Sequence, residues 1–214
     1  MSTIDELLAA AEPREPKPAG GLLERLLAAG LPLEPDAPAP DVTVAGLTED
    51  SRRVQPGGCF VAVVGAHSDG HDHLAEAAAR GAAIALVERR IPGLAIPQVE
   101  VVDSRRALAA AACWWYGDPS RKLATIGITG TDGKTTTSFL AVAALEASGV
   151  PSGMVGTVET KIGAVREGSG EHVTTPGAPA LQRALRAMAA AGDRAAVVET
   201  TSHGIALARV DGIA

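Results

Sequence analysis

The chain has 214 residues, of which 46% are hydrophobic and only 2% aromatic, so its cores must be built mainly from alanine, leucine, valine and isoleucine. That length is enough for one large or two small domains. The formal net charge of −6 argues against a nucleic-acid surface, because neutralising phosphates requires clustered Lys and Arg. No apolar run in the sequence approaches the ~20 residues that span a membrane. We therefore expect a cytoplasmic protein with no nucleic-acid or membrane partner. We also expect a monomer, although composition and charge do not determine the oligomeric state.

The N-terminal part of the chain predicts two helices separated by proline-rich segments. Residues 2–11 favour a short helix, and residues 12–20, with three prolines, break it. We expect residues 1–20 to be a flexible extension with little role in a core. Residues 21–29 carry leucines at helical spacing, which predicts a second helix. Residues 31–40, with four prolines, must form a loop.

The next part of the chain alternates strands with helices, which is typical of a mainly parallel sheet with right-handed crossovers. The expected elements are strands at residues 59–64, 83–88 and 98–102 and helices at residues 72–80 and 104–116. A Gly-Asp-Pro-Ser segment at residues 117–120 breaks this pattern. We therefore divide the chain into a first domain, residues 21–120, and a second, residues 121–214.

The second domain predicts another α/β unit. The expected elements are strands at residues 124–129, 154–159 and 195–199 and helices at residues 135–148 and 178–191. A polar segment with three glycines, residues 163–170, separates two of them. A sheet of this class typically has ~5–6 strands, and only about three are expected here. We therefore expect a chain that is truncated within this domain.

A glycine-rich turn lies between the first strand and the first helix of the second domain, in Ala124-Thr-Ile-Gly-Ile-Thr-Gly-Thr-Asp-Gly-Lys-Thr-Thr-Thr137. Gly130 and Gly133 let backbone N–H groups point inward at an anion, and the helix start adds a positive dipole end. Lys134 can reach the β/γ-phosphates of a nucleotide, and the Thr135 hydroxyl can ligate Mg²⁺. The alternative is an ordinary glycine turn, because isoleucine stands where the standard phosphate-loop pattern has its first glycine.

This shifted loop resembles that of the Mur ligases, the ATP-dependent enzymes that add amino acids to the peptidoglycan precursor, and of folylpolyglutamate and cyanophycin synthetases. Segments on both sides of the loop look like those of the UDP-N-acetylmuramoyl-tripeptide synthetases, the MurE type. They are Thr48-Glu-Asp-Ser-Arg52, Val54-Gln-Pro-Gly-Gly-Cys-Phe60, Asp69-Gly-His-Asp72, Thr174-Thr-Pro176 and Glu199-Thr-Thr-Ser-His203. The resemblance runs from about residue 22 to the last residue.

The resemblance implies a small Rossmann-like N-terminal substrate domain followed by the first part of a P-loop central domain. The ATP-binding residues it implies are Gly130, Thr131, Asp132, Gly133, Lys134, Thr135 and Thr136. The implied substrate-binding residues are Ser51, Ala66, His67 and Ser68 for the uridine diphosphate part and Thr174, Thr175, Thr201 and Arg209 for the muramoyl-peptide part. Lys134 and Glu199 are the implied catalytic residues, and Thr135 and Glu199 the implied Mg²⁺ ligands.

The reaction implied by the resemblance is ATP-dependent amide formation with ATP and Mg²⁺ as cofactors. A diamino acid, meso-diaminopimelate or L-lysine, is joined to UDP-N-acetylmuramoyl-L-alanyl-D-glutamate through an acyl phosphate. Asp132 and Leu207 depart from the family pattern, which usually has asparagine at the first position and in some members glutamine at the second. The family's later Asp-His-Leu-Asp segment, its carbamylated lysine and its C-terminal domain lie beyond residue 214.

Two rival functions are a folate-type ligase and a protein that is not itself an enzyme, either an inactive fragment or a substrate-binding module. The Asp50-Ser51-Arg52 segment ahead of the loop argues against the first. The cluster of His67, His71 and His73 permits a zinc site, although no cysteine accompanies it. The Trp114-Trp-Tyr116 segment fits either a base-stacking platform or packing at the domain junction. His203 fits either a phosphate contact or a structural role.

Overall fold

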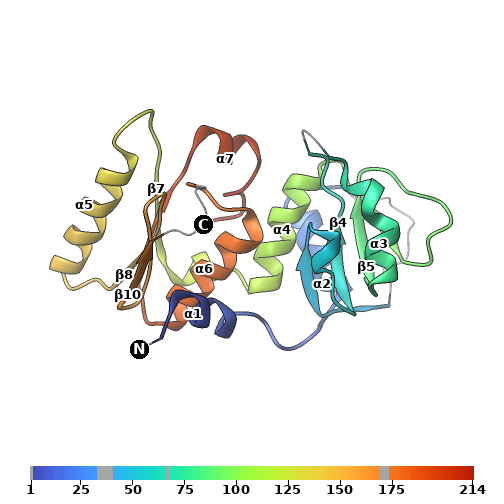
Figure 1. Cartoon of the computed structure of the whole chain (residues 1–214), viewed down its shortest axis with the longest axis horizontal. Helices are drawn as coiled ribbons and strands as arrows, with labels where there is room; N and C mark the ends of the chain where they lie inside the picture. The colour runs from blue at the N-terminus through green and yellow to red at the C-terminus, as the bar shows by residue number, and fades with distance from the viewer. Residues whose placement is uncertain (1, 33–40, 66–67, 169–173) are drawn as a thin grey trace. The chain divides into compact units, whose positions relative to one another are not determined.

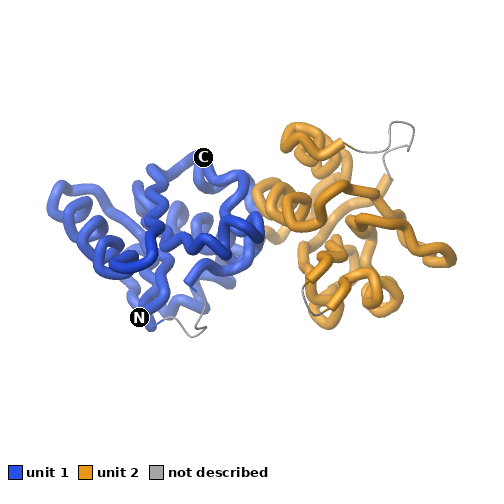
Figure 2. The backbone as a smooth tube through the Cα atoms, turned by 90° about the horizontal axis from the view of Figure 1, so that it is seen from above, with its two compact units in different colours: residues 1–12, 116–214 blue, residues 13–115 orange. Residues whose placement is uncertain are grey.

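The computed structural model describes residues 2–32, 41–65, 68–168 and 174–214 (Figure 1). The chain forms two compact units, drawn in different colours in Figure 2. Unit 1 comprises residues 1–12 and 116–214, and unit 2 comprises residues 13–115. Each unit is built around one main sheet with helices, which confirms the α/β class.

Unit 2 contains a four-stranded parallel sheet in the order β3-β4-β5-β6. Its strands are β3 Gly46–Thr48, β4 Gly58–Val61, β5 Ile84–Val87 and β6 Gln98–Glu100. Its helices are α2 Ala19–Ala28, α3 Leu74–Ala79 and α4 Ser104–Tyr116, with 3-10 turns η1 Ser51–Arg53 and η2 Gly70–His73. A short antiparallel pair joins β1 Lys17–Pro18 to β2 Thr43–Val44.

The two central strands of unit 2 are buried along their whole length. Every residue of β4 and β5 is buried, as expected for parallel strands covered on both faces. Phe60 and Val87 pack with Leu74 and Ala77 of α3 on one face. Figure 1 shows α4 on the opposite side of these strands from α3. The continuous apolar runs that predicted these strands are therefore explained by two-sided burial.

The two tryptophans near the end of α4 belong to the packing of unit 2. Trp115 is only 1% exposed. The Lys17 ammonium lies 5.4 and 5.6 Å from the ring centroids of Trp114 and Trp115, and it donates to both of their carbonyl oxygens. This arrangement favours the packing interpretation over a base-stacking platform.

Unit 1 contains a five-stranded mixed sheet in the order β10-β9-β8-β11-β7. Its strands are β7 Ala124–Ile128, β8 Ser152–Val155, β9 Glu159–Ile162, β10 Val165–Gly168 and β11 Ala195–Glu199. Its helices are α1 Ile4–Ala10, α5 Lys134–Ala147, α6 Ala178–Ala190 and α7 Ser202–Ala206, with the 3-10 turn η3 Pro119–Lys122. Strands β8, β11 and β7 are parallel, and β9 and β10 extend the sheet as an antiparallel hairpin.

The sheet of unit 1 is covered by α5 on one face and α6 on the other (Figure 1). Because side chains alternate along a strand, β11 serves both cores. Val197 packs in the cluster that includes Val142 of α5. Ala196 and Val198 pack in the cluster of α6 residues. This two-sided packing fixes the carboxyl ends of the parallel strands, where the phosphate loop begins.

Two expectations from the sequence are wrong in unit 1. About three strands were expected, but the sheet has five, because β9 and β10 form a hairpin in which the residues of β10 alternate between half-buried and exposed positions. Residues 1–20 were expected to be a flexible extension. Instead, Ile4 and Ala11 are buried in the α6 cluster, and the Ile4 N–H donates to the Glu167 carboxylate at 2.9 Å.

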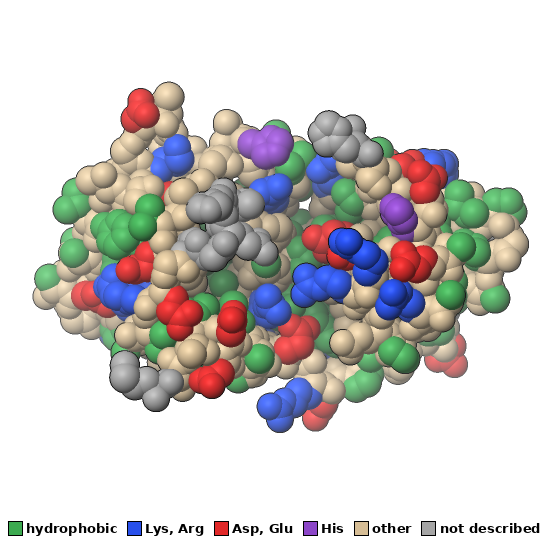
Figure 3. Space-filling model, in the orientation of Figure 1, with side chains coloured by type: hydrophobic (Ala, Val, Ile, Leu, Met, Phe, Trp, Pro, Cys, Tyr) green, Lys and Arg blue, Asp and Glu red, His purple; other side chains and the backbone are tan. Residues whose placement is uncertain are grey.

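The surface carries charges of both signs. On the face drawn in Figure 3, acidic and basic side chains are interspersed within each unit. None of the helices that the structure describes is both long and apolar enough to cross a membrane.

Candidate functional site

The phosphate loop connects β7 to α5 at the carboxyl edge of the parallel strands. Gly133 has φ of +76°, a backbone conformation that side-chain-bearing residues rarely adopt, and it caps the start of α5. The N–H groups of the first turn of α5 have no acceptor within the helix. The loop and helix start therefore present backbone donors at the place where open α/β sheets bind ligands.

Lys134 is folded back over its own loop. Its ammonium donates to the carbonyl oxygens of Gly130 at 2.8 Å and Thr131 at 3.3 Å. Phosphate oxygens carry negative charge, so they attract the ammonium more strongly than these neutral carbonyl oxygens do. The lysine is thus held directly over the loop, within reach of an anion that the loop binds.

Glu199 ends β11 and is completely buried. Its register partner on β7 is Ile128, which places the carboxylate beside the phosphate loop. Its Oε2 atom accepts hydrogen bonds from the hydroxyls of Thr135 at 3.1 Å and Thr157 at 2.9 Å. Its Oε1 atom is buried and has no hydrogen-bond partner among the described residues.

The unpartnered oxygen fits a cation. Leaving a buried charged acceptor without a partner is costly, on the order of 1–3 kcal/mol or more. Mg²⁺ takes oxygen ligands and is commonly held by one or two protein groups together with substrate phosphates. The Glu199 carboxylate and the adjacent Thr135 hydroxyl therefore form a donor set that suits Mg²⁺ at a nucleotide site.

Gly156, directly after β8, keeps the space around Glu199 open. A Cβ atom at this position would lie 2.5 Å from Oε1 and 3.0 Å from Cδ of Glu199. Both distances are at or below the closest approach that Cβ atoms make in proteins. Only glycine at residue 156 leaves the free oxygen in its present position.

The backbone of Glu199 is held by a second group of predicted residues. The Thr175 hydroxyl donates to the Glu199 carbonyl at 3.0 Å and accepts the Thr201 N–H at 3.0 Å. The Arg209 guanidinium donates to the Thr175 carbonyl at 2.6 Å. Thr201 accepts the Gly204 N–H and caps α7. These three predicted substrate residues lie together, and their contacts here support the end of β11.

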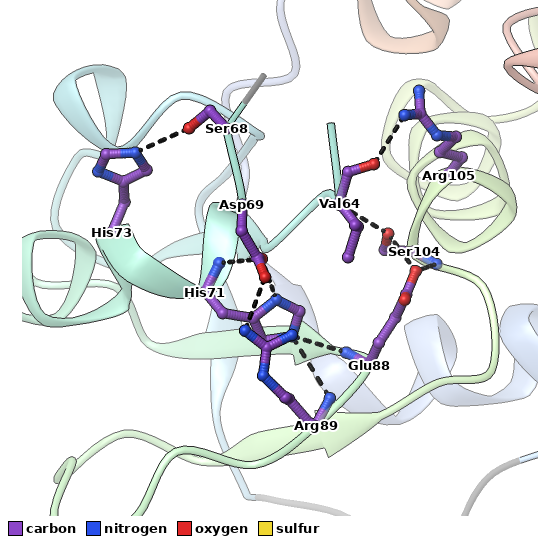
Figure 4. Close-up of polar contacts among 9 residues, drawn as sticks. All are labelled: Val64, Ser68, Asp69, His71, His73, Glu88, Arg89, Ser104 and Arg105. Atoms are coloured by element: carbon purple, nitrogen blue, oxygen red, sulfur yellow. Dashed lines mark hydrogen bonds and ion pairs between the residues drawn. The ribbon is translucent and has the colours of Figure 1, made fainter. Parts of the chain in front are cut away.

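In unit 2, the chain makes a tight turn after β4, shown in Figure 4. Val64 and Asp69 form an antiparallel bridge, and the Gly65 N–H donates to the Ser68 carbonyl at 2.9 Å. The predicted ligands Ala66 and His67 lie outside the described residues. Ser68, the third predicted ligand, contacts the His73 ring at 3.2 Å.

Val64, the residue before this turn, is hydrogen-bonded to residues at the start of α4 (Figure 4). The Val64 N–H donates to the Ser104 hydroxyl at 3.3 Å, and the Val64 carbonyl accepts from Arg105 at 2.7 Å. The Ser104 hydroxyl in turn donates to the Glu88 carboxylate at 2.6 Å. Both polar backbone groups of Val64 are therefore bonded to α4.

Asp69, the residue after this turn, is held by contacts with His71 and Arg89 (Figure 4). The Asp69 carboxylate bonds the His71 Nδ1 atom at 2.6 Å and accepts from Arg89 at 2.6 Å. Hydrogen bonds from the His71 backbone N–H, the Arg89 guanidinium and the His71 ring hold the pKa of Asp69 well below its usual range. His71 Nε2 accepts the N–H groups of Glu88 and Arg89 at 3.0 and 3.3 Å, so Nδ1 carries the ring proton.

These contacts engage His71, one of the three histidines considered for a zinc site, and His67 lies outside the described residues. Both ring nitrogens of His71 are occupied by protein partners. Nowhere in the described ranges do three or more His, Cys, Asp or Glu side chains gather as metal ligands would. Ser51 is also engaged, since its hydroxyl donates to Glu76 at 2.6 Å and this hydrogen bond lowers the pKa of that carboxyl.

Comparison with known proteins decides the family. Residues 43–116 match the description "Mur ligase family, catalytic domain", and residues 128–214 match the "Mur ligase middle domain". The chain belongs to the Mur ligase family.

Its relatives include curated enzymes and solved structures. A UDP-N-acetylmuramyl-tripeptide synthetase from Roseiflexus sp. (strain RS-1) is 46% identical over 167 residues, which are 76% of this chain and 32% of the relative. A UDP-N-acetylmuramoyl-L-alanyl-D-glutamate–2,6-diaminopimelate ligase from Bacillus cereus is 40% identical over 178 residues, 83% of this chain and 36% of the relative. A solved ligase structure of the latter name has 28% identity and a TM-score of 0.68, covering 85% of this chain and 37% of the other. The Mur ligase chain thus spans about a third of the length of these relatives.

The structure of this Mur ligase chain brings together the predicted loop residues, Thr135 and Glu199 at one edge of the unit 1 sheet. Ser51 and Ser68 lie in unit 2, and His203 is exposed on α7. Sequence reasoning missed Gly156, Thr157 and Ser104. The signal for the first two was their place directly after a buried parallel strand, where ligand-binding loops begin.

Proposed function

We propose that this Mur ligase chain holds the nucleotide-sugar-binding unit and the ATP-binding loop of a MurE-type ligase. The reaction joins a diamino acid, meso-diaminopimelate or L-lysine, to UDP-N-acetylmuramoyl-L-alanyl-D-glutamate in peptidoglycan synthesis, and uses ATP and Mg²⁺. The proposal is supported by relatives named for these activities at 40% and 46% identity. It includes a cytoplasmic location and a monomeric state. For the monomeric state, the expected result in sedimentation velocity is a single species with the mass of one chain.

The observation that carries the proposal is the carboxylate of Glu199. It is buried beside the phosphate loop, it accepts from Thr135, and one of its oxygens has no partner in the described part of the chain. A stably folded protein rarely leaves such an atom unpartnered without a ligand to meet it. Mg²⁺, when bound to Glu199 and Thr135, would neutralise charge on the ATP phosphates.

The proposed chemistry proceeds in two displacements. The free carboxylate of the dipeptide attacks the γ-phosphorus of ATP, releases ADP and becomes an acyl phosphate. The amine of the diamino acid then attacks the acyl carbon and releases inorganic phosphate, which leaves an amide and a proton lost from the nitrogen. Phosphoryl transfer of this kind depends on positioning and charge stabilisation rather than on covalent catalysis by the protein.

The residues of this chain supply positioning and positive charge. The Lys134 ammonium, released from its loop carbonyls, would bond the β/γ-phosphate oxygens, and the N–H groups at the start of α5 would bond the same anion. The turn after β4 in unit 2, which includes Ser68, would bind the uridine diphosphate part together with Ser51. Thr174, Thr175, Thr201 and Arg209 would serve the muramoyl-peptide part.

The test is isothermal titration of the 214-residue chain with Mg²⁺-ATP and, separately, with UDP. In the Lys134→Ala variant we expect ATP affinity to fall by about tenfold to hundredfold, because hydrogen bonds to charged groups contribute about 1.5–3 kcal/mol. UDP affinity should be unchanged. Lys122→Ala, which removes an exposed lysine from the same unit, is the matched control. Equal loss of ATP and UDP binding would contradict the division of roles.

A second measurement separates a working ligase from a binding module. The binding module is an alternative because the chain spans only about a third of the length of its relatives. ADP release in the presence of the dipeptide substrate, ATP and a diamino acid would place the chemistry in this chain. Binding of ATP and UDP without ADP release would restrict its role to binding.

A further inference from the structure

Thr157 joins two parts of the unit 1 site that the sequence motifs treat separately. It follows Gly156 in the connection from β8 to β9. Its Oγ1 atom lies 2.9 Å from Oε2 of Glu199 and 2.9 Å from the hydroxyl oxygen of Thr174. The hydroxyl of Thr157 thus connects Glu199, the proposed Mg²⁺ ligand, to Thr174, a proposed ligand of the muramoyl-peptide part of the substrate.

The direction of these two hydrogen bonds follows from the number of protons. A threonine hydroxyl has one hydrogen to donate, and a carboxylate oxygen can only accept. Thr157 must therefore donate to Glu199, and its contact with Thr174 must be a hydrogen bond that Thr174 donates. The chain of donors runs from Thr174 to Thr157 to Glu199.

This chain of donors determines which carboxylate oxygen is free. Two hydroxyls, those of Thr157 and Thr135, converge on Oε2 of Glu199, while Oε1 keeps no partner in the described ranges. Thr135 is itself a proposed Mg²⁺ ligand, so the position of its hydroxyl oxygen would be set in part by the cation, even though a lone pair can bind the cation while the hydrogen still points to Glu199. Thr157 is then the donor to Glu199 whose place does not depend on the cation.

We propose that Thr157 is a positioning residue that fixes the rotation of the Glu199 carboxylate, so that Oε1 faces the cation, and that links this carboxylate to Thr174. The proposal rests on the proposed function, because it takes Glu199 as a Mg²⁺ ligand. It assigns Thr157 no contact with substrate or nucleotide. Its consequence is specific: loss of the hydroxyl weakens the Mg²⁺-dependent part of ATP binding.

The experiment measures ATP affinity of the full chain twice, with Mg²⁺ and with EDTA, by isothermal titration. The ratio of the two affinities is the readout. In Thr157→Val we expect this ratio to fall by about tenfold, the effect of losing one hydrogen bond to a charged group. ATP affinity in EDTA should stay within about twofold, since the phosphate loop and Lys134 are unaltered. In Thr157→Ser, which keeps the hydroxyl, the ratio should stay within about twofold of wild type.

The matched control is Thr125→Val in β7. The hydroxyl of Thr125 is buried and has no hydrogen-bond partner in the described residues, so the same substitution removes no hydrogen bond there. Should Thr157→Val fail to fold, Thr157→Ala removes the hydroxyl without the second γ-methyl and must give the same loss. Thr174→Val should change the ratio less than Thr157→Val, because it leaves the donor to Glu199 in place.

The outcomes separate this proposal from the proposed function. Wild-type chain that does not bind ATP more tightly with Mg²⁺ than with EDTA overturns the Mg²⁺ site itself. If ATP affinity depends on Mg²⁺ in the wild-type chain, and Thr157→Val and Thr157→Ala both retain this dependence, only the role of Thr157 is overturned. Equal losses with Mg²⁺ and with EDTA also overturn it, because they would show a general structural effect rather than positioning of the carboxylate.

Discussion

The turn after β4 in unit 2 and the Glu199 carboxylate in unit 1 are built in opposite ways. Both ends of the turn are held by neighbouring elements, with Val64 bonded to α4 and Asp69 bonded to His71 and Arg89. Glu199 is completely buried, whereas Val64 and Asp69 are half-buried, and one of the carboxylate oxygens of Glu199 has no partner among the described residues. The difference fits the two ligands proposed for these regions: a backbone held in shape before binding would suit the nucleotide sugar, and an unpartnered carboxylate oxygen would suit a cation.

The largest effect is expected from filling the space beside the free oxygen. In Gly156→Ala, the new Cβ would lie 2.5 Å from Oε1 of Glu199, so the carboxylate must move. Overpacking of this kind costs about 1–3 kcal/mol, and we expect the Mg²⁺-dependent part of ATP affinity to fall by about tenfold or more. Titration with Mg²⁺ and with EDTA measures it. Gly168→Ala, whose Cβ would make only an ordinary contact at 3.8 Å, is the control in the same unit.

A smaller effect is expected from loosening the turn in unit 2. Ser104→Ala removes the acceptor of the Val64 N–H and the hydroxyl donor to Glu88. Each hydrogen bond contributes about 0.5–1.5 kcal/mol, so UDP affinity should fall by roughly twofold to tenfold while ATP affinity stays constant. Thr43→Ala, at an exposed position of β2, provides the comparison. Unchanged UDP binding in a folded Ser104→Ala chain would show that the turn does not need this support.

The smallest effect is expected at Asp132, an exposed carboxylate within the phosphate loop. Its negative charge opposes the phosphates, so Asp132→Asn should raise ATP affinity by about twofold to fivefold, the usual range for exposed charge pairs. The gain should shrink in high salt, because salt screens exposed charges. Asp5→Asn, at an exposed position of α1, should leave ATP affinity unchanged. A gain that is independent of salt would point to a cause other than charge.

The sequence predicted the parts of the fold that carry strong local signals. The buried strands β4, β5 and β11 have continuous apolar runs, and the phosphate loop has its glycines and lysine in order. The β9–β10 hairpin was missed because its edge strand, Val165-Arg-Glu-Gly168, has two adjacent charged residues and ends in glycine, so that it resembles a polar loop. The partners of Glu199 were partly missed, because Thr157 belongs to no motif and meets Glu199 only after the strands have paired.

Helix α1 belongs to unit 1 although residues 13–115 of unit 2 separate it from the rest of that unit. Ile4 shares its buried cluster with Leu181 and Leu185 of α6. On the ribosome, which adds ~5–20 residues per second, α1 emerges roughly ten seconds or more before this partner helix. The first segment to be made is therefore among the last to be packed. A protein cut between the two units would separate α6 from α1, so expressing unit 1 alone requires the opening dozen residues to be supplied with it.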